Sequence, residues 1–360
     1  MIKKYLLYSD NPDKSIDIEL LKDLFDKNSN WKPYDKELDK FIDFSYVIGN
    51  YKNIPSDISY RFNLTHRDFL TNKHILYKTI EREEPELYNK FMVKHYDINI
   101  EDLEKNKHIF LNGKLIIIRP TWAYERSGII IVDNFQSFKN YMNNKGKYLY
   151  YNILKKRPNE KHTFVASEYI KNVLTFNNRV SDFRVFFLVS LVDGIYRSYL
   201  IKPIVMNLSK FERTKFNITN IKENITFAKN DKDYFMHDLK KNIGKDNYKF
   251  MKSQILHILS TLFRLIKKYK IMDKYEDQNN VYEIFGLDFI SDNNYNIKLI
   301  EFNEKTGLGD YEDDLYQNIA NAFINSTINK KYSNSDMYKI QLDDFIKKNI
   351  VRIRSNKKYL

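Results

Sequence analysis

Apolar positions along the chain predict two groups of strands. Short β-branched runs at residues 114–118 and 129–132 each read as one strand. Residues 184–192 form a longer apolar run, and Asp193-Gly194 then leads into a second apolar run at residues 195–201. Because Asp-Gly favours a tight reversal of the chain, these two runs predict a β-hairpin.

Other segments follow a helical period. Between residues 255 and 266, apolar side chains recur at i, i+3, i+4, i+7, i+8 and i+11, which predicts an amphipathic helix packed on a core. Residues 65–84 predict a charged helix that Thr65 can cap and that Pro85 closes. The chain from about Met337 onward is basic and predicts a helical tail, either solvated or, as the less favoured alternative, a docking surface.

The strongest local signal is a hairpin that carries acids, at residues 282–303. Two apolar strands flank an Asp/Asn-rich turn at residues 292–296. The midpoint between Asp288 and Glu301 falls inside this turn. The two acids are therefore predicted to be near cross-strand partners, with their Cβ atoms about 4.5–5.5 Å apart.

The alternation of strand side chains predicts what each face of this hairpin carries. Asn303 falls on the face of the two acids, whereas Phe289, Ile300 and Phe302 are predicted to point into a core. Neighbouring carboxylates repel each other unless a cation or proton lies between them. Such hard oxygen ligands suit Mg²⁺ that bridges nucleotide phosphates. A surface hairpin with exposed acids is the alternative, and the apolar neighbours of both acids disfavour it.

Composition narrows the class of protein. The chain has 360 residues, of which 42% are hydrophobic, so it can bury a substantial core. Its formal net charge of +13 favours acidic partners such as nucleic acid, anionic lipid or an acidic peptide. AT-rich coding DNA explains the charge equally well, because Lys, Asn, Ile and Tyr abound while Gly and Pro are scarce. With no cysteine, disulfides, thiolate metal sites and a cysteine nucleophile are excluded.

The sequence shows no targeting or membrane signal. No apolar run approaches the length of a membrane span, polar residues follow too soon after the start for a signal peptide, and no internal repeat is visible. We therefore expect a soluble, cytoplasmic protein that does not bind a membrane. We also expect it to be a monomer.

The hairpin also resembles a known family. Residues 283–292 (Glu-Ile-Phe-Gly-Leu-Asp-Phe-Ile-Ser-Asp) and 299–303 (Leu-Ile-Glu-Phe-Asn) are similar to the metal-binding strands of ATP-grasp enzymes, and specifically of the tubulin tyrosine ligase-like family. That family has a Phe-Gly-hydrophobic-Asp run followed by Leu-hydrophobic-Glu-Val-Asn. Four further parts of the chain resemble family motifs in the right order: residues 64–70, 117–120 with 127–129, 166–170 with 181–185, and 216–220.

The resemblance covers residues 60 to 325 and implies an α+β chain with the ATP-grasp fold. The nucleotide would bind between a central and a C-terminal lobe. The implied divisions are an N-terminal α/β lobe (1–63), a central lobe (64–166), a C-terminal lobe with the metal site (167–330) and a basic helical tail (331–360).

The resemblance also implies roles for individual residues. Asp288, Glu301 and Asn303 would be the Mg²⁺ ligands, Arg67 and Arg119 would hold ATP phosphates, and Gly128 would close the phosphate loop. Glu168, Tyr169 and Ile170 would form the adenine hinge, and Asp182 would bind the nucleotide or its ribose. Arg184 would act with Glu301 in catalysis by neutralising the γ-phosphate or the acyl phosphate, and Thr219 and Asn220 would line the amino-acid pocket.

The chain departs from the family pattern at several of these positions. Arg67 and Arg119 stand where the family has lysines, which keeps the charge but changes the geometry. Only the last glycine of the phosphate loop remains, and Trp122 and Tyr124 either stiffen this loop or cap the nucleotide. Three predicted site residues also have ordinary alternatives: Arg184 as a surface cation, Tyr169 as a core residue and Glu168 as a solvated acid.

The reaction that the resemblance implies is an ATP- and Mg²⁺-dependent carboxylate–amine ligation. A free amino acid (Tyr, Glu or Gly) would be added to a protein carboxylate through an acyl phosphate, and an acidic tail such as that of tubulin would be the acceptor. A catalytically inactive ATP-grasp scaffold that binds an acidic protein is the first alternative. A nucleic-acid-binding protein is less favoured, because it gives no role to the acidic hairpin.

Overall fold

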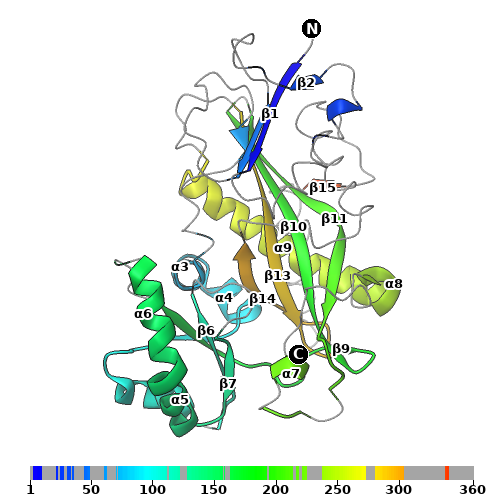
Figure 1. Cartoon of the computed structure of the whole chain (residues 1–360). Coiled ribbons are helices and arrows are strands. Elements are labelled where there is room, and N and C mark those ends of the chain that lie inside the picture. The colour runs from blue at the N-terminus through cyan, green and yellow to red at the C-terminus, as the bar shows by residue number, and fades with distance from the viewer. Residues whose placement is uncertain are drawn as a thin grey trace.

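The structure is a computed structural model, shown in Figure 1. It describes residues 3–9, 22, 25–27, 31–33, 35, 44–48, 61–62, 70, 72–111, 113–121, 128–156, 158, 163–192, 194–213, 216–218, 221–224, 237–272, 280–303 and 337–339.

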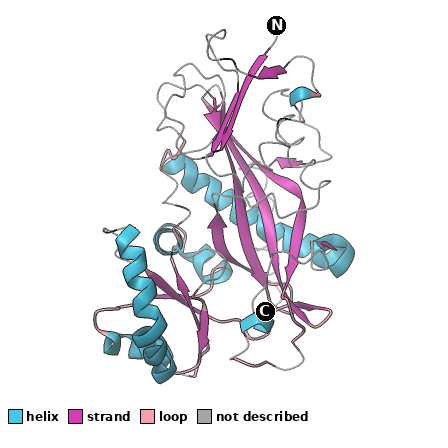
Figure 2. Ribbon diagram, viewed as in Figure 1, coloured by secondary structure: helices cyan, strands magenta, loops and turns pink. Residues whose placement is uncertain are grey.

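The described strands form two sheets (Figure 2). The strands of the large sheet are β1 (Lys3–Ser9), β2 (Trp31–Pro33), β3 (Phe44–Ile48), β4 (Arg61–Phe62), β9 (Thr175–Phe176), β10 (Arg179–Val192), β11 (Ile195–Leu208), β12 (His237–Asp238), β13 (Asn280–Ser291), β14 (Ile297–Asn303) and β15 (Met337–Lys339). The small sheet contains β5 (His95–Asp97), β6 (Ile116–Pro120), β7 (Ile130–Val132) and β8 (Phe164–Glu168).

Helices flank these sheets. They are α3 (Lys73–Glu83), α4 (Pro85–Phe91), α5 (Phe135–Tyr141), α6 (Lys147–Lys156), α7 (Ile221–Asn224), α8 (Leu239–Ile243) and α9 (Lys245–Lys268), together with a 3₁₀ helix (Leu103–Phe110) and a π-helical segment (Met142–Gly146). The fold is α+β, as the sequence predicts. None of the helices described here combines the length and apolar character that crossing a membrane requires.

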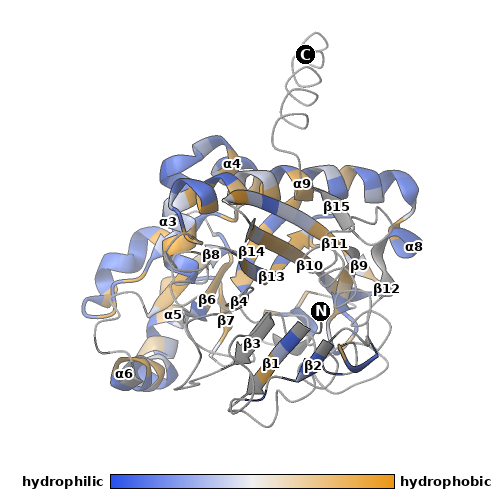
Figure 3. Ribbon diagram, turned by 90° about the horizontal axis from the view of Figure 1, so that it is seen from above, coloured by the Kyte–Doolittle hydropathy of each residue, from blue (hydrophilic) through white to orange (hydrophobic). Residues whose placement is uncertain are grey.

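The long antiparallel strands β10, β11 and β13 are the centre of the large sheet. Val192 pairs with Ile195 at the tip of the β10–β11 hairpin, which confirms the hairpin predicted from the sequence. The apolar stripe of α9, including Ile255, Ile258 and Leu262, is fully buried and belongs to the same core as Phe183 and Phe289 of the sheet. The predicted amphipathic helix is therefore confirmed, and Figure 3 shows α9 lying along one face of the sheet.

The first strands of the chain extend this large sheet. Strand β4 pairs in parallel with one end of β13, through Val281 and Arg61, and β3 and β1 continue outward from β4. At the other end of β13, the same edge pairs with β14. Strand β13 thus joins the N-terminal strands to the acidic hairpin.

The small sheet has a core of its own. Strands β6 and β7 pair antiparallel, as the two β-branched runs predict, and β8 pairs with the other edge of β6. Ile116, Ile118, Phe138 and Phe164 are buried in this second core. Figure 1 shows α5 and α6 beside the small sheet, away from α9. Each sheet is therefore packed on its own hydrophobic core, and the two cores are separate.

Helices α3 and α4 lie against the large sheet. Leu76, Tyr77, Ile80 and Phe91 belong to the core of that sheet. Helix α3 begins at Lys73, because the side chain of Asn72 accepts hydrogen bonds from the first turn. The predicted start of this helix at Thr65 is wrong, because Asn72 has extended backbone and caps α3 in its place; Thr65 itself lies outside the described residues. Helix α3 ends before Pro85, as predicted, and Pro85 then opens α4, since a proline is tolerated in the first turn of a helix.

The predicted helical tail is wrong for three of its residues. Met337–Lys339 form strand β15, which pairs antiparallel with Tyr199–Ile201 of β11. The exposed backbone groups of a sheet edge offer hydrogen bonds that a single-segment pattern cannot reveal. The rest of the tail lies outside the described residues.

Candidate nucleotide and metal site

The acidic hairpin has the predicted register. Asp288 of β13 lies directly opposite Glu301 of β14. The turn between the strands is closed by hydrogen bonds from Asp292 N to Asn296 O (3.1 Å) and from Tyr295 N to Asp292 O (3.0 Å). The cross-strand pairing of the two acids is therefore confirmed.

The hairpin contains a β-bulge that the sequence does not predict. Asp288 pairs with Glu301, but the next pair joins Phe289 to Leu299, so Ile300 is an extra residue on β14. Phe289 and Phe302 are buried in the core as predicted, whereas Ile300 lines a pocket. The predicted core position of Ile300 is wrong, because the bulge turns two consecutive side chains, Ile300 and Glu301, toward the pocket.

Asp288 is held by cationic and amide groups. Arg184, its cross-strand partner on β10, donates from Nε to Asp288 Oδ1 and from Nη2 to Oδ2 (2.9 Å). Asn303 Nδ2 donates to the same Oδ2 at 3.1 Å. Burial raises the pKa of Asp288 to about 6 despite Arg184, and Asp182 and Glu301 add to the rise. Asp288 thus still favours a further proton or cation.

Glu301 has a different cation. Lys73 Nζ of α3 donates to Glu301 Oε1 at 2.9 Å. Burial acts to raise the pKa of Glu301, but Lys73, with Arg119 and Arg184 farther away, lowers it below its usual value. Glu301 is therefore an ionised carboxylate, and among the described residues only its Oε1 has a hydrogen-bond partner.

Arg119 is a buried cation at the end of β6. It is only 6% exposed, and its Nη2 donates to Tyr77 Oη (3.1 Å) and to Ser167 Oγ (3.2 Å). Its Nε has no hydrogen-bond partner among the described residues. Within the described residues this guanidinium has no carboxylate partner, and an uncompensated buried charge is unfavourable, so the position favours an anionic ligand.

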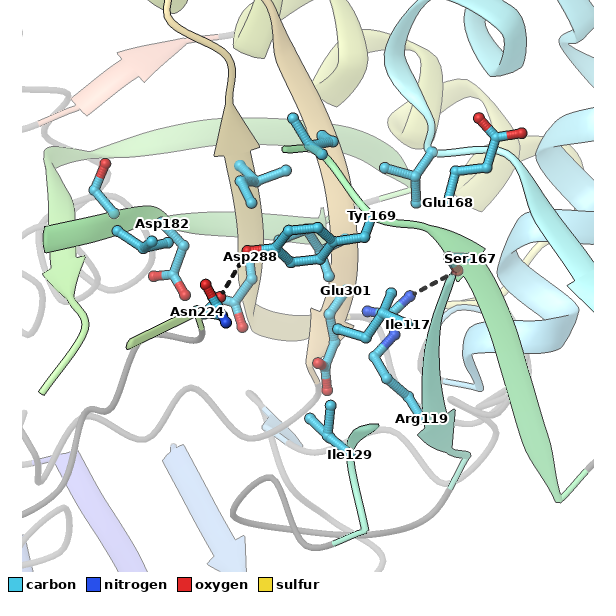
Figure 4. A pocket seen from close by; sticks show the side chains of 16 residues that line it. Ile117, Arg119, Ile129, Ser167, Glu168, Tyr169, Asp182, Asn224, Asp288 and Glu301 are labelled. Atoms are coloured by element: carbon cyan, nitrogen blue, oxygen red, sulfur yellow. Dashed lines mark hydrogen bonds between the residues drawn. The ribbon is translucent and has the colours of Figure 1, made fainter. Parts of the chain in front are cut away.

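A single pocket brings most of these residues together between the two sheets (Figure 4). Its empty volume is about 850 Å³, including space open to solvent. It is lined by Val93, Ile117, Arg119, Ile129, Ser167, Glu168, Tyr169, Ile170, Val180, Ser181, Asp182, Asn224, Asp288, Ile290, Ile300 and Glu301. Apolar walls and a few charged groups suit a ligand with both an aromatic base and phosphates.

The predicted adenine hinge lies on this pocket, but Glu168 points elsewhere. Its carboxylate accepts hydrogen bonds from Tyr96 Oη (2.7 Å) and Lys114 Nζ (2.6 Å), and Figure 4 shows it directed away from Glu301. Burial acts to raise the pKa of Glu168, but Lys114 and Tyr96 lower it. Residues 168–170 therefore line the pocket, while the Glu168 carboxylate binds Tyr96 and Lys114 outside it.

Tyr169 and Asp182 line the pocket with fixed side chains. Tyr169 Oη donates to Asn224 O at 3.2 Å, and burial raises the pKa of this tyrosine. Asp182 Oδ1 accepts from Asn207 Nδ2 at 2.8 Å. Both positions agree with a pocket wall, and their predicted roles toward a nucleotide stay predictions.

The remaining predicted residues are not all on the pocket wall. Gly128 is not a lining residue, although Ile129 is. Its φ is +77°, a conformation that favours glycine, and a Cβ at this position would lie 2.4 Å from Leu149 Cδ1, so the structure of the fold explains this glycine without a ligand. Arg184 and Asn303 do not line the pocket either, but both donate hydrogen bonds to Asp288, which does. Arg67, Trp122, Tyr124, Thr219 and Asn220 lie outside the described residues.

Sequence reasoning missed Lys73 and Tyr77. Both lie on α3, where Lys73, Leu76, Tyr77 and Ile80 follow the i, i+3, i+4, i+7 spacing of a buried face. A lysine within such a stripe is the signal that could have identified the residue. Tyr77 Oη donates to the carbonyl of Ile300 in the bulge at 2.7 Å.

A comparison with models of protein families identifies the family of the chain. The model of the tubulin-tyrosine ligase family matches residues 60–340. The chain belongs to this family. Its fold is accordingly ATP-grasp-like, and membership supports an ATP-dependent carboxylate–amine ligase in general. A comparison with curated proteins finds no match.

The family generally uses ATP and Mg²⁺, and the residues present here fit both. Within the described part of the chain, no three His, Cys, Asp or Glu side chains are grouped to hold a metal. The two carboxylates and the Asn303 amide are nevertheless hard oxygen donors. The Asp288 carboxyl, with its raised pKa, and the incompletely bonded Arg119 guanidinium suit a cation and an anion, respectively.

Proposed function

We propose that this chain uses ATP to join a free amino acid to a carboxylate of an acidic protein. The observation that carries the proposal is the pocket between the two sheets, where Asp288, Glu301 and Arg119 meet apolar walls. The same residues stand at the metal and phosphate positions of the family resemblance. The amino acid is Tyr, Glu or Gly, and an acidic tail such as that of tubulin is the acceptor.

The reaction has two balanced steps. An oxygen of the acceptor carboxylate attacks the γ-phosphorus of ATP, the bond to the leaving ADP oxygen breaks, and an acyl phosphate forms. The amine nitrogen then attacks the acyl carbon, inorganic phosphate leaves and the nitrogen releases a proton. Such chemistry depends on positioning and charge neutralisation more than on covalent catalysis by the protein.

The buried cations supply that neutralisation. Arg119, fixed by Tyr77 and Ser167, holds a phosphate oxygen without reorganising, because two neutral groups already orient it. Arg184 sets the position of Asp288 through two hydrogen bonds and adds positive charge beside the γ-phosphate. Arg67 is the second phosphate contact in this proposal.

Asp288, Glu301 and Asn303 would hold Mg²⁺. When bound, the ion would neutralise charge on the phosphates of ATP. The apolar residues Val180 and Ile290 would bind the adenine base beside Tyr169 and Ile170, Asp182 would bind the ribose, and Thr219 and Asn220 would line the amino-acid pocket.

An inactive scaffold is the second candidate, because the carboxylates already have protein partners. Arg184 pairs with Asp288, and Lys73 pairs with Glu301. A site balanced in this way can persist without a metal. Such a scaffold would bind an acidic protein and would not turn over ATP.

A labelling assay separates the two candidates. Purified protein is incubated with ATP, Mg²⁺, Glu-rich acceptor peptides and a panel of radiolabelled amino acids. We expect incorporation with ADP release in the wild type, and a loss of about 100-fold or more in Glu301→Gln. Glu101→Gln, at an exposed acid outside the pocket, is the control. Incorporation that is unchanged in Glu301→Gln would refute the proposed site, and peptide binding without ATP turnover would support the scaffold.

A further inference from the structure

Lys73 lies where a lysine is not favoured by its helix. It is the first residue of α3, and the first turn of α3 contains no acidic residue. A cation is unfavourable at this positive end of the helix dipole. Its side chain is also only 9% exposed, so it loses hydration. Neither helix formation nor burial explains a lysine at this position.

The contact of Lys73 explains it better. Lys73 Nζ lies 2.9 Å from Glu301 Oε1, and no other ion pair of Lys73 occurs among the described residues. The two residues are 228 positions apart in the chain. A buried pair of this kind often adds little net stability, because desolvation offsets the attraction. Its value therefore lies in fixing the position of the Glu301 side chain.

Helix α3 holds the bulge at a second point, one turn farther along. Tyr77, four residues after Lys73, donates to the carbonyl oxygen of Ile300 at 2.7 Å. Residues i and i+4 lie on the same helix face, so both contacts come from one surface of α3. The helix thus holds both the backbone of Ile300 and the carboxylate of Glu301.

We propose that Lys73 is a positioning residue for the metal site, which binds Oε1 of Glu301 and leaves Oε2 to coordinate the cation. This inference rests on the proposed function, since it concerns the same Mg²⁺–nucleotide site. Outer groups that orient a metal-binding carboxylate typically change metal affinity by about 10–100-fold when they are removed. Lys73 is such a group, contributed by a segment that precedes the hairpin by more than two hundred residues.

The test measures cation binding directly. Mn²⁺ replaces Mg²⁺, and its binding in the presence of a non-hydrolysable ATP analogue is followed by electron paramagnetic resonance. We expect Lys73→Met to weaken Mn²⁺ binding by about tenfold or more. Lys73→Arg should restore part of the loss, because it keeps a cation beside Glu301. Lys78→Met, at a half-exposed lysine of the same helix that pairs with Asp97, should bind Mn²⁺ as the wild type does.

The outcomes separate the two proposals. Wild-type protein that binds no Mn²⁺–nucleotide refutes the proposed function together with this inference. Wild-type binding that Lys73→Met leaves unchanged refutes the inference alone. Circular dichroism of each variant without ligand shows whether it is folded. If Lys73→Met does not fold, Lys73→Gln replaces it, and unchanged Mn²⁺ affinity in that variant overturns the inference equally.

Discussion

At the scale of single residues, Tyr77 contacts both the site and a buried histidine, His95. The ring of His95 stacks on that of Tyr77 with 4.8 Å between the centroids, and His95 Nδ1 is hydrogen-bonded to Tyr88 Oη at 2.5 Å. No ion-pair partner of His95 occurs among the described residues. Burial lowers the pKa of His95 to about 4, and the nearby cation Lys78 contributes to the decrease. The imidazole is therefore neutral in the folded protein.

This histidine should make the fold sensitive to acid. In the unfolded chain His95 takes up a proton near its ordinary pKa of 6.5, whereas the folded state resists protonation down to about 4. The unfolded state binds more protons in this window, so stability falls as the pH falls. We expect a loss of about 2 kcal/mol between pH 7 and pH 5 from this residue.

Urea unfolding of wild type and His95→Phe at both pH values measures the effect. Phenylalanine keeps the aromatic stack but cannot be protonated, so the difference between the two pH values should shrink by about 2 kcal/mol. The loss of the Tyr88 hydrogen bond lowers the stability of the variant equally at both pH values and cancels in this comparison. An equal pH dependence in both proteins would show that His95 does not control acid sensitivity.

At the scale of elements, the acidic hairpin depends on the side chain of Asp292. Its Oδ1 accepts hydrogen bonds from Asn294 N and Asn296 N, both at 2.9 Å, and its Oδ2 accepts from Asn296 Nδ2 at 3.0 Å. The turn also holds Tyr295 at a φ of +61°, which is uncommon for a residue other than glycine. The aspartate thus satisfies backbone donors of a turn whose sequence contains no glycine.

Asp292→Ala should weaken the hairpin. We expect the free energy of unfolding to fall by about 1–2 kcal/mol, because charge-assisted hydrogen bonds to two backbone amides are lost at a partly exposed position. Asn293→Ala is the matched control, since its exposed side chain makes no hydrogen bond among the described residues, and it should change stability by less than about 0.5 kcal/mol. Equal effects in thermal unfolding would mean that the Asp292 side chain does not stabilise the turn.

The same hairpin shows how far sequence reasoning reaches. The Asp/Asn-rich turn and the apolar flanks contain enough local information to predict that Asp288 pairs with Glu301, and the structure confirms it. The bulge at Ile300 could not be predicted, because its carbonyl is satisfied by Tyr77, a residue 223 positions earlier. Strand β15 likewise forms by pairing with the edge of β11, a distant segment that the local sequence pattern of residues 337–339 does not reveal.

The site residues divide in the same way. Asp288, Glu301 and Arg119 stood out because charged residues interrupt or end apolar strands. Lys73 did not, because a lysine on a charged helix is usually solvated, although its spacing from Leu76 and Ile80 places it on the buried face of α3. The roles assigned to Arg67, Thr219 and Asn220 stay predictions, since these residues lie outside the described ranges.

At the scale of the whole molecule, the pocket lies between two separate cores. One core contains α3, α9 and the large sheet, and the other contains the small sheet with α5. Arg119 crosses this boundary, since its Nη2 bonds both Tyr77 of the first core and Ser167 of the small sheet. A ligand that contacts both walls should therefore stabilise the two cores together.

This arrangement predicts how nucleotide binding changes the stability of the protein. A non-hydrolysable ATP analogue with Mg²⁺, at a hundred times its dissociation constant, adds about 2.7 kcal/mol and should raise the melting temperature by about 4 °C. Arg119→Met should reduce this shift to about 1 °C, because the buried cation that faces the phosphates is lost. Arg82→Met, at an arginine whose side chain is 66% exposed, should keep the full shift. Differential scanning fluorimetry measures all three proteins. A full shift in Arg119→Met would place the phosphates away from this cation, and the pocket between the sheets would then no longer explain nucleotide binding.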